Sequence, residues 1–140
     1  MKLKHCPCGS QISYALCCGR YHKGNIHAPT AEALMRSRYS AYVLDNAQYV
    51  YRTWDEDTRP PLKILREDNS QLFNQLQIIS TTKGDIDDDT GTVEFIASYK
   101  LENNDEIHQH HENSYFIKLK NHWLYVSELS KVDFDIESTN

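Results

Sequence analysis

Apolar residues recur at helical spacing between residues 31 and 44, which predicts an amphipathic helix. Thr30 precedes this stretch and is a good N-cap, because its side-chain oxygen can accept a backbone N–H of the first turn. Glu32 lies in that first turn, where the helix dipole favours an acidic side chain. The side chains predicted to form the helical part of the core, here and at the end of the next helix, are Leu34, Met35, Tyr39, Tyr42, Val43 and Trp54.

Asp45-Asn46 interrupts the helical pattern, and a second, shorter helix is predicted over residues 47–54. Two consecutive prolines, Pro60 and Pro61, end this second segment. Leu62, Ile64 and Leu65 then predict one or two further helical turns.

The second half of the chain has the alternation of apolar and polar residues that is typical of strands. Lys83-Gly84, Asn103-Asn104 and Asn121-His122 are turn signals between these segments. Short connections between successive strands imply an antiparallel sheet, and helices followed by strands imply an α+β fold. The predicted strands cover residues 72–82, 92–101, 106–120 and 122–129.

Composition fits a folded protein of one domain, or of one domain with a small appendage: 140 residues, 39% hydrophobic and 25% charged. The net charge of −5 disfavours a nucleic-acid-binding role. No apolar stretch approaches the roughly 20 residues of a membrane-spanning helix, and no apolar signal segment follows Lys2 and Lys4. We therefore expect no membrane segment. The clustered cysteines, which suit a metal site, imply the reducing cytoplasm.

All four cysteines lie in the first 18 residues, and this region has too few apolar residues to fold without a metal. Four clustered thiolates can surround one tetrahedral zinc ion, and a closed shell of four protein ligands is structural. His22 or His5 could replace one cysteine, and free cysteines are the less favoured alternative. We expect a zinc knuckle over residues 1–24, a short linker, and an α+β domain over residues 30–134. The predicted zinc ligands are Cys6, Cys8, Cys17 and Cys18.

The cysteine region resembles the SEC-C motif, named for the C-terminal tail of the SecA translocation ATPase. The resemblance rests on Cys-Pro-Cys-Gly-Ser at 6–10, on Tyr14 and on Cys-Cys-Gly at 17–19. It implies zinc at the four cysteines and a protein partner for the knuckle. Gln11 replaces the usual glycine, and the lysines usual in the middle are absent. The side chains expected to be exposed for contact with a partner are Lys4, His5, Gln11, Tyr14, Arg20 and Tyr21.

A second resemblance runs from Cys6 to at least Pro60, resumes in two later segments, and joins the SEC-C knuckle to a larger domain. The chain resembles the YchJ-like family of small bacterial proteins, which implies a nuclear transport factor 2-like, cystatin-like fold. In that fold, helices pack across the concave face of a bent antiparallel sheet, whose open end commonly forms a pocket. Asp55-Glu56 and Ser127 depart from the family pattern. The matching segments are residues 34–42, 53–54, 58–60, 112–116 and 123–125.

Arg38 lies one helical turn from Leu34 and Tyr42, beside the apolar face of the predicted helix. An arginine near the core needs a carboxylate partner, and Glu112 is our candidate. We expect Arg38, Trp54 and Glu112 to line the pocket or to form a buried ion pair. Partial solvation of the arginine, with an ion pair inside the fold, is the alternative.

Residues 108–112 read His-Gln-His-His-Glu, which on a strand places His108, His110 and Glu112 on one face. Two histidines and a carboxylate can hold a metal or exchange protons. No distant third partner is identifiable, so a solvated strand end is the favoured interpretation. The acidic segment over 85–91 lacks the glycine and glutamate spacing of an EF-hand and reads as a solvated turn.

No nucleophile–base pair, phosphate loop or dinucleotide-binding fingerprint is present, and whether the protein is an enzyme stays open. The leading hypothesis is an adaptor whose zinc knuckle binds a partner protein. The alternative is a small-molecule binding protein or enzyme that uses the pocket of the α+β domain. A pocket that is open and polar, rather than filled by side chains, would favour the alternative.

Overall fold

The computed structural model describes residues 5–24, 26–67 and 71–129. Helices come first and strands follow, which confirms the predicted α+β class. Each strand begins and ends within two residues of its predicted limits. In chain order the elements are the 3₁₀ helix η1 (Tyr14–Leu16), α1 (Cys18–His22), α2 (Ala31–Val43), α3 (Ala47–Arg52), α4 (Leu62–Glu67), β1 (Gln71–Lys83), β2 (Thr90–Leu101), β3 (His108–Leu119) and β4 (His122–Glu128).

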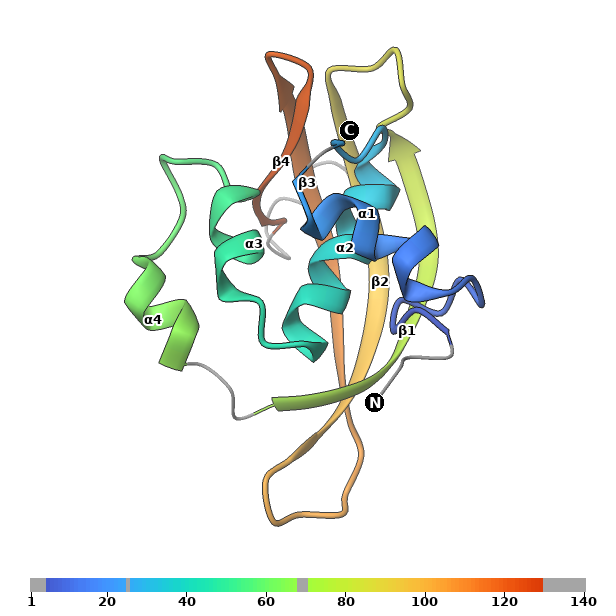
Figure 1. Ribbon diagram of the computed structural model, residues 1–140, viewed down its shortest axis with the longest axis vertical. Coiled ribbons are helices and arrows are strands. Elements are labelled where there is room, and N and C mark those ends of the chain that lie inside the picture. The colour runs from blue at the N-terminus through green and yellow to red at the C-terminus, as the bar shows by residue number, and fades with distance from the viewer. Residues whose placement is uncertain (1–4, 25, 68–70, 130–140) are drawn as a thin grey trace, which may run out of the picture.

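The four strands form one antiparallel sheet in the order β1-β2-β3-β4. Figure 1 shows that the long strands curve around the helices instead of lying flat. The register between β1 and β2 shifts between Phe73 and Gln75 and again between Ile78 and Ser80. Such irregularities bend a strand and increase its twist, so the sheet presents a concave face.

Helix α2 packs across this concave face and contacts β1, β2 and β4 (Figure 1). The Thr30 side chain accepts a hydrogen bond from the Ala33 N–H, as expected of an N-cap. Leu34, Met35 and Tyr39 are buried in the core as predicted, whereas Tyr42, Val43 and Trp54 are partly buried against it. From the sheet, the core receives Val93, Phe95, Ala97, Phe116 and Trp123.

The chain between the cysteine region and α2 is held against the domain at two points. Ala28 is buried, and the indole N–H of Trp123 donates to the carbonyl oxygen of Pro29 at 3.0 Å. The segment predicted as a linker is thus fixed at its C-terminal end. Within the described residues, no helix has both the length and the apolar character needed to cross a bilayer.

Candidate functional site

The four cysteines converge to form the first candidate site. Their sulfur atoms all lie within 4.8 Å of one another, and the Cys8 and Cys17 sulfurs are 3.7 Å apart. Around a tetrahedral zinc with bonds of about 2.3 Å, sulfurs are separated by about 3.8 Å, so the donor set fits this ion. Cys6, Cys8 and Cys18 are buried and Cys17 is half-buried.

Local backbone geometry brings these sulfurs together. The Gly9 N–H donates to the Cys6 carbonyl at 3.2 Å, and the Cys6 N–H donates to the Ile12 carbonyl at 2.7 Å, which closes a tight turn. Gly9 has a φ of 88°, a left-handed conformation in which glycine is favoured. Helix α1 begins at Cys18 and carries that thiol back to the turn.

The thiols compete for protons because they are packed together. Hydrogen bonds with Cys18 and Cys6 lower the pKa of the Cys8 thiol. Hydrogen bonds with Cys6 and Cys8 raise the pKa of the Cys18 thiol, and burial raises it further. A bound cation would remove this competition, because thiolates are the form of cysteine that ligates metals.

The cysteine cluster packs directly against α2. The Cys6 sulfur lies 3.5 Å from the Ser40 hydroxyl oxygen. Arg36 donates through Nη1 to the Cys8 carbonyl at 2.8 Å and through Nε to Glu32 at 3.0 Å. The knuckle therefore packs on the larger domain. Substitutions in the cluster will also disturb the packing of α2.

His22 joins the knuckle to α2 and is unavailable as a metal ligand. Its Nε2 lies 2.8 Å from the Ser37 carbonyl oxygen, which can only accept, so Nε2 carries the proton. Burial lowers the pKa of His22 and keeps the ring neutral. Nδ1 then accepts from the Tyr14 hydroxyl at 2.6 Å, and both ring nitrogens are occupied.

The predicted contact surface of the knuckle needs correction. Tyr21 is only 8% exposed, so its predicted exposure is wrong. Its ring belongs to the domain core, and Arg52 donates to its carbonyl oxygen at 3.0 Å. Tyr14 is half-buried, His5, Gln11 and Arg20 are exposed, and Lys4 lies outside the described residues. Two apolar side chains of the knuckle, Ile12 and Leu16, are also exposed, at 49% and 68%, and no pattern in the sequence predicted this.

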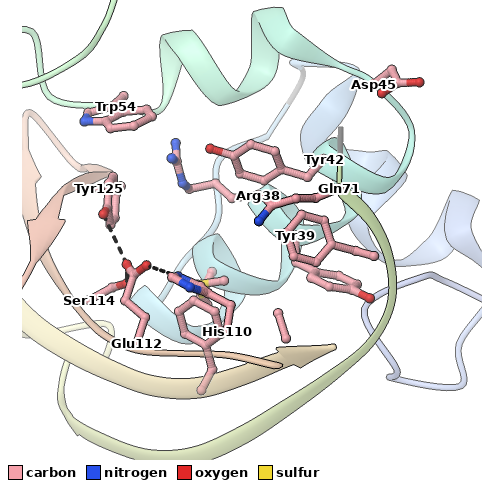
Figure 2. A pocket seen from close by; sticks show the side chains of 14 residues that line it. Arg38, Tyr39, Tyr42, Asp45, Trp54, Gln71, His110, Glu112, Ser114 and Tyr125 are labelled. Carbon is pink, nitrogen blue, oxygen red and sulfur yellow. Dashed lines mark hydrogen bonds and ion pairs between the residues drawn. The ribbon is translucent and has the colours of Figure 1, made fainter. Parts of the chain in front are cut away.

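The second candidate site is a cavity of about 250 Å³ between α2 and the concave face of the sheet. Figure 2 shows side chains from α2, from the end of α3 and from the strands around it. Part of its wall is apolar and includes Met35, Phe73, Phe95 and Ala97. The cavity is open and carries polar groups, the property that favours a small-molecule site.

Glu112 lies on the sheet side of this cavity and is hydrogen-bonded to three side chains. Oε1 pairs with His110 Nε2 at 2.7 Å, and Oε2 accepts from the Ser114 hydroxyl and from the Tyr125 hydroxyl, the latter at 3.1 Å (Figure 2). Burial raises the pKa of Glu112, but the hydrogen bonds from His110 and Ser114 prevail and lower it. The bond to Glu112 raises the pKa of His110. The two residues therefore form an ion pair at mildly acidic pH.

Arg38 lies on the helix side of the cavity and is 3% exposed, as its position beside the apolar face predicted. Its Nη1 donates to the Val50 carbonyl at 2.8 Å and to the Thr53 hydroxyl at 2.9 Å. The guanidinium carbon lies 5.0 Å from the ring centroid of Trp54 and 4.6 Å from that of Tyr125. The charge is thus held between aromatic faces.

The predicted direct pair between Arg38 and Glu112 is not formed. Among the described residues, Arg38 makes no ion pair with any carboxylate, because Glu112 is taken by His110, Ser114 and Tyr125. Burial lowers the pKa of Arg38, and the neighbouring tyrosines, Tyr42 first, oppose this lowering together with a smaller contribution from Glu112. Tyr125 stands between the two charges, with its ring on Arg38 and its hydroxyl on Glu112.

Trp54 lies in the wall of the cavity, where α3 ends and meets β4. The Tyr125 N–H donates to the Thr53 carbonyl and the Asp55 N–H donates to the Tyr125 carbonyl, both at 2.8 Å. These bonds place the Trp54 and Tyr125 rings edge to face, with centroids 5.0 Å apart. The sequence indicated Arg38, Trp54 and Glu112 as one group. It gave weaker signals for His110 and Tyr125, through strand alternation and the matching family segment.

The histidine-rich start of β3 alternates between the two faces of the sheet. Gln109 and His111 are exposed, and His111 pairs with Glu94 at 2.7 Å on the outer face. The favoured interpretation of a solvated strand end holds for this face. It is wrong for His110 and Glu112, which line the cavity.

Comparison with known proteins agrees with this architecture. Residues 30–128 match the family model described as the middle NTF2-like domain of YchJ. The chain belongs to the YchJ-like, or UPF0225, family. A UPF0225 protein of Corynebacterium glutamicum is 46% identical over 123 residues, which cover 87% of this chain and 94% of that protein. A UPF0225 protein of Streptomyces coelicolor is 45% identical over 120 residues, which cover 86% and 90%.

Two solved structures share the fold of this UPF0225 chain, and both are SEC-C motif proteins. The solution structure from Rhodopseudomonas palustris has a TM-score of 0.81 at 32% identity and covers 90% of this chain and 98% of that one. The crystal structure from Psychrobacter arcticus has a TM-score of 0.77 at 29% identity, with coverage of 90% and 82%. The resemblance to the YchJ-like family and the cystatin-like, NTF2-like fold class are therefore confirmed.

Proposed function

We propose that this UPF0225 protein is a cytoplasmic small-molecule binding protein, with the ligand site in the cavity between α2 and the sheet. The main support for this proposal is that buried charged groups and apolar walls meet in one open cavity of about 250 Å³. Ligand sites combine a mostly apolar surface with a few placed polar groups in this way. The volume lies just below the range of about 300–1,000 Å³ usual for drug-sized ligands, so a small metabolite is the expected occupant.

The proposal includes one zinc ion in the cysteine cluster, with a structural role. Cys6, Cys8, Cys17 and Cys18 would hold it, and zinc would supply a rigid tetrahedral link between the turn at Gly9 and helix α1. The support is the close approach of the four sulfurs, within 4.8 Å of one another. Four cysteines that form no disulfide also favour a reducing compartment such as the cytoplasm.

A thermal-shift screen against a metabolite panel tests the ligand site, using zinc-loaded protein. Ala97→Leu is the blocking variant, because Ala97 lines the cavity and a larger side chain there would occupy it. Thr92→Leu is the matched control, because the alternation of β2 places the same new side chain on the opposite face of that strand. Metabolites should stabilise the wild type and Thr92→Leu but not Ala97→Leu. Equal stabilisation of all three, or of none, would reject the site.

A second candidate function is the adaptor role, in which the knuckle binds a partner protein. It is favoured by the exposure of two apolar residues, Ile12 and Leu16, and of Arg20 on the knuckle. Protein interfaces have an apolar core and are enriched in arginine. Because the cysteine cluster packs on α2, replacing Cys17 and Cys18 by serine would disturb the domain as well. Leu16→Asp is the cleaner variant for a pull-down, with zinc content measured alongside.

A further inference from the structure

The pocket holds two buried opposite charges that are satisfied unequally. Glu112 is hydrogen-bonded to three side chains, and His110 balances its charge when the imidazole is protonated. Arg38 has two neutral acceptors, a backbone carbonyl and a hydroxyl, and within the described part of the chain no carboxylate contacts it. A cation that is 3% exposed is costly to bury without an opposite charge. The cavity therefore has an unmatched positive group in its wall.

Building on the proposed function, we infer that the ligand is a small organic carboxylate whose anionic group binds Arg38 and whose apolar body lies against the sheet. A guanidinium is a planar array of donors that matches a carboxylate in two parallel hydrogen bonds. The rings of Trp54 and Tyr125 lie on the Arg38 guanidinium and hold it in place. Preorganisation of this kind lowers the entropy lost on binding.

The remaining charges near the cavity do not cancel Arg38. The Glu112 carboxylate is held by His110, Ser114 and Tyr125, and its negative charge is balanced when His110 is protonated. Asp45 also lines the cavity, but it is exposed to solvent, where water and salt screen its charge. With His110 protonated and paired to Glu112, Arg38 is the charge of the cavity wall that no neighbouring carboxylate pairs with among the described residues.

The apolar wall sets the second requirement on the ligand. Phe73 and Phe95 come from adjacent strands, and Met35 from α2 closes the opposite side. A carboxylate without an apolar group would leave this apolar wall exposed to water, and its only favourable contact would be with Arg38. An aromatic or branched aliphatic acid uses both features and should bind more tightly.

Three probe molecules separate the two features: benzoate has both charge and ring, benzamide has the ring alone, and acetate has the charge alone. Dissociation constants are measured by titration of the zinc-loaded full chain at constant ionic strength. Benzoate should bind at least tenfold more tightly than either of the others. Benzamide binding as well as benzoate would overturn the carboxylate inference, and so would absence of benzoate binding.

Variants then assign the charge effect to Arg38. Arg38→Met should weaken benzoate binding at least tenfold and leave benzamide unchanged. Arg66→Met removes a positive charge from an exposed position outside this cavity and is the matched control. If Arg38→Met does not fold, Arg38→Lys keeps the charge but loses the planar donor array and should still weaken benzoate. Unchanged benzoate affinity in the folded variant would refute the inference.

Failure of this inference is distinguishable from failure of the proposed function. If neutral or cationic metabolites stabilise the wild type but not Ala97→Leu, and benzoate does not bind, the cavity is a ligand site of different chemistry. If no compound separates the wild type from Ala97→Leu, the ligand site itself is refuted.

Discussion

Replacement of Glu112 by glutamine tests whether the polar network of the cavity is built as the structure shows. Glu112 is 11% exposed at its side chain and accepts from His110, Ser114 and Tyr125. A hydrogen bond to a charged group contributes about 1.5–3 kcal/mol and a neutral one about 0.5–1.5 kcal/mol. Loss of charge in three such bonds therefore lowers the free energy of unfolding by about 3 kcal/mol.

The chain contains a matched control for this change at the outer face of the sheet. Glu94 also accepts from a histidine and a serine, His111 at 2.7 Å and Ser80 at 3.1 Å. These pairs are exposed to solvent, where such interactions contribute about 0–1 kcal/mol. Glu94→Gln should thus lower the free energy of unfolding by less than about 1 kcal/mol. Both variants are measured by urea unfolding of zinc-loaded protein, followed by tryptophan fluorescence.

The pH dependence of the Glu112→Gln effect follows from two pKa shifts of opposite sign. The pKa of His110 is raised from its ordinary value of 6.5, so its contribution is present below pH 6.5 and is lost as pH rises through the raised value. The pKa of Glu112 is lowered from 4.5, so its contribution is present above pH 4.5 and is lost on acidification below it. The difference between wild type and variant should be largest between pH 4.5 and 6.5 and smaller at pH 8. Equal, small effects of Glu112→Gln and Glu94→Gln at all pH values would refute the network.

Three further predictions concern the knuckle. Metal analysis of protein purified without chelator should give one zinc per chain, and a zinc content near zero with four titratable thiols would contradict the site. His22→Ala should lower the free energy of unfolding by about 1–3 kcal/mol, because it leaves the Tyr14 hydroxyl and the Ser37 carbonyl without this partner. The zinc content of this variant should not change. Loss of zinc would show that His22 is a ligand. If the knuckle is also a docking surface, Leu16→Asp should abolish capture of the partner protein with zinc retained, while an unchanged pull-down would exclude Leu16 from the interface.

Local signals predicted the helices and strands well because each signal acts within a few residues. Thr30 caps α2, and the alternation of β2 and β3 sorts their side chains between the two faces. Alternation alone also placed Glu112 on the same face as His110. The identity of the cluster as a four-cysteine site followed from spacing, since soft ligands this close in sequence have few other arrangements.

The partners of Arg38 could not be predicted from the sequence, because they depend on the register of the strands. A register shift between Tyr115 and Phe116 changes how β4 pairs with β3 and helps to bring Tyr125 toward Glu112. A bulge of this kind has no reliable local signature. The burial of Tyr21 was missed for a related reason, since the docking of the knuckle on the domain leaves no periodic pattern in the chain.

Because Arg38 has no direct ion pair, we expect its removal to lower the free energy of unfolding by less than the breaking of a buried ion pair would. Breaking a buried pair typically costs about 3–5 kcal/mol, because it leaves the partner charge uncompensated. Glu112 keeps its three other partners when Arg38 is removed. The principal loss in Arg38→Met is thus expected in ligand binding.

The most direct test of the central claim is a fragment screen of zinc-loaded, ¹⁵N-labelled protein by two-dimensional NMR. The two indole N–H signals report on two places: Trp54 lines the proposed ligand cavity, and Trp123 lines a separate cavity near Pro29, to whose carbonyl its N–H donates. Fragments that bind the proposed site should shift the Trp54 signal and leave the Trp123 signal in place. Hits that shift Trp123 alone, or the complete absence of hits at Trp54, would contradict the account.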